Sequence, residues 1–144
     1  APLLLIRNIR KGEQVGYGGT WTAPRDTRLG LVPIGYADGY LRAFSNRAVM
    51  MVHEIPCPVV GRVSMDSTMI DLTNVPTVSV GDSVTILDSD PLSPASVYAL
   101  ANWADSIPYE LFCRIGNRVT RVATDPLDDS ADVEDQPAFR RESA

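Results

Sequence analysis

The sequence lacks several features that would place it in a specialised class of protein. Its two cysteines, Cys57 and Cys113, are too few for a disulfide framework. The simplest interpretation is two reduced, partly buried thiols in a cytoplasmic protein. The longest aliphatic runs, such as residues 3–6, are far too short to cross a bilayer, and no basic-then-apolar signal segment is visible. We therefore expect no membrane partner.

Acidic residues outnumber basic residues in the chain as a whole. The net charge is −5, and residues 125–144 alone carry seven acids against two arginines, so the remaining residues are balanced. Without a basic face, nucleic acid is not an expected partner. His53 is the only histidine, and it forms no metal-ligand set with the two distant cysteines. A P-loop, a nucleotide-binding glycine fingerprint and a serine-nucleophile elbow are also missing.

Length and composition are those of one ordinary globular domain. The chain has 144 residues, of which 44% are hydrophobic and 22% charged. We expect this domain to occupy residues 1–124. Residues 125–144 have few large apolar side chains and a high charge, which predicts a disordered acidic tail. Such a tail is either an interaction element or a solvated end of the chain.

Short apolar segments separated by turn residues predict a mostly β fold. The expected strands are residues 3–9, 28–34, 47–52, 58–63, 69–72, 83–87 and 118–122. Ser93 as N-cap and Pro94 at the first helical position predict a helix over 94–104, and Pro108 begins a second that ends near Gly116. This pattern is typical of a β-barrel or sandwich, here with a small helical insert near residues 94–115.

The most distinctive stretch runs from residue 11 to residue 66. It places reactive or polar side chains among glycines in three pieces, residues 15–21, 35–42 and 61–66. Glycine there allows a tight turn or a close approach to a ligand. Tyr17 and Tyr36 each follow a glycine directly, which is an arrangement expected of a binding or catalytic site.

Each of these residues also has a structural interpretation. Tyr17 could pack on a half-buried strand, or its hydroxyl could donate and accept a proton if a cation lies nearby. Asp38 precedes a glycine and could simply close a hairpin. Arg42 could be a solvated charge or an anion contact. Met65 could lie in the core, or its backbone N–H could hold a carboxylate.

Three segments in order, residues 11–21, 34–42 and 60–66, closely resemble the C-terminal domain of bacterial alanine racemase. Residues 108–111, followed by Arg118 and Val119, match the closing segment of that family. The resemblance covers roughly residues 3–123. It implies a mostly β domain with a barrel-like core, in agreement with the pattern of short strands.

The resemblance also implies roles for individual residues. Tyr17 corresponds to the tyrosine that is one of two bases in racemisation, and Tyr36 to a second tyrosine at the entrance and substrate side of the active site. Met65 corresponds to the residue whose backbone N–H contacts the substrate carboxylate. Ser64 stands where some members have cysteine, and Asn117 where some have a tyrosine.

In this family the β domain completes, in trans, an active site on the barrel of its homodimer partner. The N-terminal barrel carries the lysine that forms a Schiff base with pyridoxal phosphate. Lys11, the only lysine here, belongs to the loop before Tyr17. We therefore expect half of a catalytic site, inactive without the barrel.

The implied activity is the interconversion of L- and D-alanine, a small-molecule substrate, for peptidoglycan precursor supply. A racemase for serine or lysine, and a non-catalytic β-barrel dimerisation module, are the alternatives.

Overall fold

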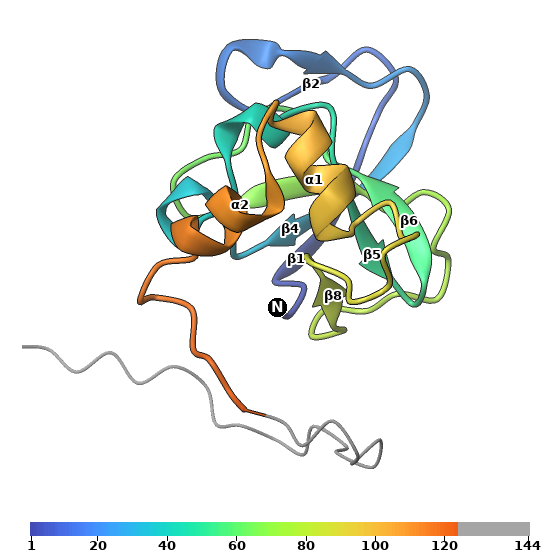
Figure 1. Cartoon of the computed structure of the whole chain (residues 1–144). Helices are drawn as coiled ribbons and strands as arrows, with labels where there is room; N and C mark the ends of the chain where they lie inside the picture. The colour runs from blue at the N-terminus through green and yellow to red at the C-terminus, as the bar shows by residue number, and fades with distance from the viewer. Residues whose placement is uncertain (124–144) are drawn as a thin grey trace, which may run out of the picture.

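The computed structural model describes residues 1–123, and Figure 1 shows the order of their elements. Strands dominate, joined by three short 3-10 helices and two short α-helices. The predicted domain limit at residue 124 and the predicted tail over 125–144 lie outside the described residues. Within residues 1–123, no helix is both long enough and apolar enough to cross a membrane.

A three-stranded antiparallel sheet carries the loops that matter most below. Its central strand is β4 (Thr27–Val32), between β1 (Leu5–Ile9) and β7 (Thr68–Asp71). Every residue of β4 is buried or half-buried, which agrees with the apolar side chains of Leu29, Leu31 and Val32. Pro33 cannot donate to a ladder and lies just beyond the strand. The register places Val32 opposite Thr68, so the loop after β4 and the loop before β7 leave the same edge.

A second sheet has the order β6 (Ile55–Pro58), β5 (Val49–Val52) and β8 (Val84–Thr85). His53 and Glu54 form the turn between β5 and β6, with φ of 48° and 62°. Positive φ at both residues is what a two-residue hairpin requires. The predicted strand over 58–63 was therefore placed too late, because so tight a turn brings Ile55 opposite Val52.

A two-stranded ribbon, β2 (Gln14–Val15) paired with β3 (Trp21–Thr22), projects from the other elements in Figure 1. The chain between these strands forms the 3-10 helix η1 (Tyr17–Gly19). The pairing of Val15 with Trp21 therefore anchors both ends of the glycine-rich segment that contains Tyr17.

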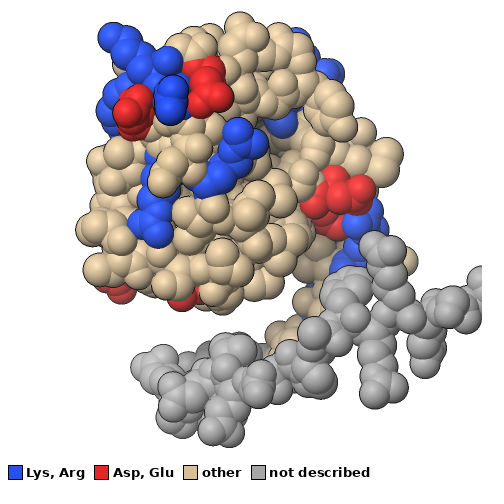
Figure 2. Space-filling view, turned by 180° about the vertical axis from the view of Figure 1, so that it is seen from behind, with Lys and Arg blue, Asp and Glu red and all other residues tan. Residues whose placement is uncertain are grey.

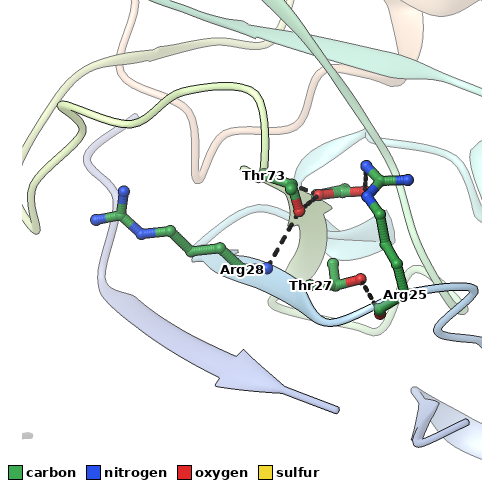
Figure 3. A network of polar contacts seen from close by, with 5 residues as sticks. Arg25, Thr27, Arg28 and Thr73 are labelled. Carbon is green, nitrogen blue, oxygen red and sulfur yellow. Dashed lines mark hydrogen bonds and ion pairs between the residues drawn. The ribbon is translucent and has the colours of Figure 1, made fainter. Parts of the chain in front are cut away.

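A polar network joins the start of β4 to the turn after β7 (Figure 3). The Asp71 carboxylate accepts a hydrogen bond from the Thr73 N–H at 2.9 Å and lies 3.3 Å from the Arg25 guanidinium. The Thr73 hydroxyl in turn accepts a hydrogen bond from the Arg28 N–H at 3.2 Å. These contacts fix the sheet edge opposite the one from which the site loops leave.

Charges of both signs lie among uncharged residues over the face shown in Figure 2. Some arginines serve the fold directly. The Arg28 guanidinium donates to the carbonyls of Val75, Pro76 and Val78 at 3.2, 2.9 and 2.8 Å. This side chain therefore ties an irregular segment to β4.

The helices α1 (Val97–Trp103) and α2 (Pro108–Arg114) lie side by side in Figure 1. Ser96 is the N-cap of α1, and its hydroxyl accepts a hydrogen bond from the Ala99 N–H at 3.2 Å. The predicted start at Pro94 was wrong, because the Ser93 hydroxyl instead accepts from the Ala95 N–H within a turn. Pro108 does begin α2, as predicted.

The strand predicted over 118–122 does not form. Residues 117–118 form a turn, closed by a hydrogen bond from the Val119 N–H to the Gly116 carbonyl at 3.2 Å, and the rest of the described segment is irregular. The Arg118 side chain instead forms ion pairs with two aspartates, and the Arg121 guanidinium donates to the Ile115 carbonyl at 2.7 Å. These contacts hold the segment over a loop rather than beside a strand.

The predicted mostly β fold with a small helical insert is confirmed. The strands form three small sheets that do not close into one continuous barrel, and the two three-stranded sheets share the larger of two apolar clusters. The β2–β3 ribbon packs with Ile9 and Leu29 in the smaller cluster. The largest fully buried side chains include Phe44, Leu3, Leu29, Met50, Ile70 and Leu72. Burial of this apolar surface is the main source of stability.

Both cysteines are free, but they lie in different surroundings. Cys57 is buried, and burial, followed by the nearby charge of Asp71, raises the pKa of its thiol to about 11. Cys113 is exposed on α2, so the prediction of two partly buried thiols was wrong for this residue.

Truncating Leu72 to alanine should destabilise the 144-residue chain, because the side chain is completely buried in the core. We expect a loss of about 2–5 kcal/mol in the free energy of unfolding, measured by urea denaturation. Leu92→Ala is the matched control, since Leu92 is 91% exposed and its loss should stay within about 0.5 kcal/mol. Equal losses for the two variants would contradict this description of the core.

Candidate active site

A polar hollow of about 700 Å³ brings the three predicted site residues together. Its lining comes from segments far apart in the sequence and includes four hydroxyl groups and two guanidinium groups. The lining residues are Tyr17, Tyr36, Arg42, Arg62, Val63, Ser64, Met65, Asp66 and Ser67. A hollow with this lining suits a small ligand that carries a carboxylate.

Tyr17 enters the hollow from η1, and 75% of its surface is exposed. The ring therefore does not pack in the core of this chain. The backbone of this loop packs closely against the backbone of residues 61–62. A Cβ added at Gly16 would lie 2.9 Å from the Arg62 backbone nitrogen. The Arg62 guanidinium approaches the same loop at Gly18, where an added Cβ would lie 3.9 Å from its Nε. A cation thus lies beside the tyrosine loop.

Tyr36 begins η2 (Tyr36–Asp38), which lies on the backbone of residues 64–65. The Tyr36 N–H donates to the Ser64 carbonyl at 3.0 Å, and the Ala37 N–H donates to the Met65 carbonyl at 3.1 Å. Gly35 is required here, because a Cβ at this position would lie 2.2 Å from the Ser64 oxygen.

Asp38 does not close a hairpin, so that interpretation was wrong. It is buried at the end of η2, and its carboxylate accepts a hydrogen bond from the Gly35 N–H at 2.9 Å. This contact closes the loop on itself. Arg42, at the start of η3 (Arg42–Phe44), lines the hollow rather than facing open solvent alone.

Met65 is 52% exposed, so it does not belong to the core. The Met65 carbonyl accepts a hydrogen bond from the Ala37 N–H. The hydroxyl of the neighbouring Ser64 donates to the Ser67 carbonyl at 2.8 Å. Within residues 1–123, the Met65 N–H has no hydrogen-bond acceptor. The geometry is therefore compatible with a backbone donor for a carboxylate.

Arg118 was missed as a site residue, because the sequence placed it in a strand. Its Nε lies 3.2 Å from Asp38 and its Nη2 lies 2.7 Å from Asp66, at the rim of the hollow. The hydrogen bond with Asp66, followed by the charge of Asp38, raises the pKa of Arg118 above its ordinary value. Only the match of residues 118–119 to the closing segment of the family pointed to this position.

Asn117 and Lys11, which the sequence analysis singled out, lie apart from the hollow. Asn117 is exposed and does not line the hollow. Lys11, the only lysine in the sequence, lies in the turn between β1 and β2 and does not line it either. No lysine therefore lines the hollow.

A second cavity, of about 400 Å³, is lined almost entirely by apolar side chains beneath α1 and α2. The Tyr40 hydroxyl is buried at this cavity without a hydrogen-bond partner among the described residues, and burial raises its pKa. Such a hydroxyl stays protonated. No group of three or more metal-binding side chains exists within residues 1–123. The polar hollow is therefore the better candidate for chemistry.

Comparison with known proteins gives the family. Residues 1–123 match the family model for the alanine racemase C-terminal domain. Alanine racemase of Thermodesulfovibrio yellowstonii is 43% identical over 119 residues, which are 83% of this chain and 33% of that protein.

Two solved structures show the same relationship. The alanine racemase of Streptomyces lavendulae, a D-cycloserine producer, superposes with a TM-score of 0.80 at 36% identity, over 89% of this chain and 33% of that one. The Bartonella henselae alanine racemase, which contains covalently bound pyridoxal phosphate, has a TM-score of 0.78 at 30% identity, over 85% and 33%. The chain spans about a third of the length of these relatives. It belongs to the alanine racemase family, within which it corresponds to the C-terminal domain.

Proposed function

We propose that this chain supplies the substrate-facing half of an alanine racemase that interconverts L- and D-alanine with pyridoxal phosphate. The observation that carries the proposal is that Tyr17, Tyr36 and Met65 line one polar hollow, and that the Met65 N–H has no acceptor among residues 1–123. The D-alanine formed would supply peptidoglycan precursors. The other half of the site would come from the N-terminal barrel, which lies outside this sequence.

Racemisation removes the α-proton from one face of the amino acid and returns a proton to the other. Two opposed acid/base groups are therefore needed. Pyridoxal phosphate, when bound, supplies the electron sink that makes the α-proton acidic. In this chain the Tyr17 hydroxyl holds or accepts the proton on one face, while a lysine outside the chain serves the other face.

An ordinary tyrosine, with a pKa near 10, acts as a base at neutral pH only if its anion is stabilised. We expect the group that stabilises this anion to come from the barrel outside this sequence. The Met65 N–H would donate a hydrogen bond to the substrate carboxylate. Tyr36 would limit the space on the substrate side.

The site side chains are unusually exposed for groups that must exclude water. Tyr17 is 75% exposed, Met65 52% and Tyr36 44%. Charge stabilisation of the kind required is strongest in a water-excluded site. We therefore propose that the barrel of the partner subunit covers the hollow in a homodimer, so that Tyr17 acts in trans.

The isolated 144-residue chain should not racemise alanine, because it lacks the lysine that serves the other face. We expect pyridoxal phosphate binding no stronger than to an unrelated protein with exposed amines. A coupled D-alanine oxidase assay and a visible absorbance titration measure the two properties. Turnover by the purified chain would contradict the division of the site between two domains.

The substitution Met65→Leu in the full-length enzyme should leave the KM for alanine within about twofold of wild type. The side chain is half exposed, and the proposed contact uses only the backbone N–H. Steady-state kinetics with alanine, serine and lysine would also identify the preferred substrate. A hundredfold rise in KM for Met65→Leu would show that the side chain makes the contact.

Removing the hydroxyl of Tyr17 tests the mechanism directly. Tyr17→Phe in the full-length enzyme should lower the racemisation rate roughly 10²–10⁴-fold, which is the usual contribution of a positioned acid/base group. The cofactor spectrum should not change. In D₂O, α-hydrogen exchange should be lost for the enantiomer whose proton faces Tyr17 and should persist for the other.

Tyr98→Phe is the matched control, because Tyr98 is an exposed tyrosine on α1 that does not line the hollow. This variant should racemise alanine at the wild-type rate. Wild-type exchange of both enantiomers by the Tyr17→Phe enzyme would refute the proposed role of Tyr17.

A further inference from the structure

Three separate segments meet at the rim of the hollow. Residues 35–39 lie on residues 64–66 through the hydrogen bonds of Tyr36 and Ala37. They also lie against the end of α2, since a Cβ on Gly39 would be 2.6 Å from the Arg114 carbonyl oxygen. The Gly116 N–H donates to the Asp38 carbonyl at 3.4 Å, which continues this contact past the helix.

The Arg118 guanidinium joins all three segments. It extends from the segment after α2, and its two ion pairs end on Asp38 and Asp66. Asp38 lies two residues after Tyr36, and Asp66 directly follows Met65. Because the guanidinium is planar and rigid, the separation of Nε and Nη2 is fixed, and this limits how far apart the two carboxylates can move.

The two aspartates differ in burial, and therefore in how strongly the ion pair with Arg118 stabilises each carboxylate. The Asp38 side chain is only 10% exposed, and its other oxygen already accepts from the Gly35 N–H. A buried carboxylate is costly unless it is paired and hydrogen-bonded. The Asp66 side chain is 58% exposed, so its pairing with Arg118 contributes little to stability. Loss of the second ion pair should therefore leave the chain folded, so its effect on the rim can be tested separately from stability.

We propose that Arg118 is a positioning residue, which holds the Tyr36 loop and the Met65 N–H at the separation that substrate binding requires. This inference rests on the proposed function, because it assigns the two positioned groups to the substrate. Without Arg118, the Asp38 and Asp66 carboxylates repel each other across the rim. The Met65 N–H then loses its fixed direction.

The test is Arg118→Ala in the full-length enzyme, with Arg114→Ala as the matched control. Arg114 is also about half exposed and also forms an ion pair, with Glu110 at 2.6 Å, but it contacts neither Asp38 nor Asp66. We expect Arg118→Ala to raise the KM for alanine about tenfold, with kcat changed less than about threefold, because a misdirected contact is lost in binding. Arg114→Ala should leave both constants within about twofold.

Two further variants separate positioning from simple destabilisation. Arg118→Lys keeps the charge but, as a single ammonium, lacks the fixed fork, so it should recover only part of the KM. Asp66→Asn removes one exposed carboxylate without leaving a buried charge, so it should raise KM in the same direction with an unchanged Tm. If Arg118→Ala fails to fold, the Asp66→Asn result decides.

A wild-type KM in both Arg118→Ala and Asp66→Asn would overturn the proposal. Full recovery of KM by Arg118→Lys would also overturn it, because charge alone would then be sufficient. Tyr17→Phe, measured in the same assay, separates the two levels of inference. If Tyr17→Phe is inactive while the Arg118 variants have a wild-type KM, only the positioning role fails; if Tyr17→Phe is fully active, the proposed function fails.

Discussion

The contact between the backbones of residues 35–37 and 64–65 is the constraint on which the candidate site depends. Two N–H groups of the first segment donate to two consecutive carbonyls of the second, at 3.0 and 3.1 Å. The approach is so close that only glycine fits at position 35. Both carbonyls of residues 64–65 consequently accept hydrogen bonds, while the Met65 N–H has no acceptor among residues 1–123.

The first sheet brings these two segments together. Because Val32 of β4 lies opposite Thr68 of β7, the loop that leaves β4 and the loop that enters β7 share one edge of the sheet. The close contact between Gly16 and residues 61–62 then adds the Tyr17 loop to the same edge. The site is thus assembled by strand register and by glycine contacts, and no side-chain packing among the three proposed site residues is required.

The sequence was informative wherever a local signal decided the outcome. The two tyrosines that directly follow a glycine pointed to the hollow, and Pro108 correctly marked the start of α2. Local signals failed where a distant partner decided. Asp38 before a glycine is typical of a hairpin, but its carboxylate pairs with Arg118, which is distant in the sequence. Among the described residues, the segment after residue 118 likewise has no neighbouring strand to pair with, which no local signal could reveal.

The domain can be stable although its candidate site is exposed, because different residues form the core and the site. The largest fully buried side chains belong to the core, and none of them lines the hollow except Val63. Tyr17, Tyr36 and Met65 therefore contribute little apolar burial, and their positions are fixed through backbone contacts beneath them. Buried side chains consequently provide most of the stability, whereas backbone contacts fix the geometry of the site. A surface from a second protein domain can then cover the three side chains without disturbing the core that holds them.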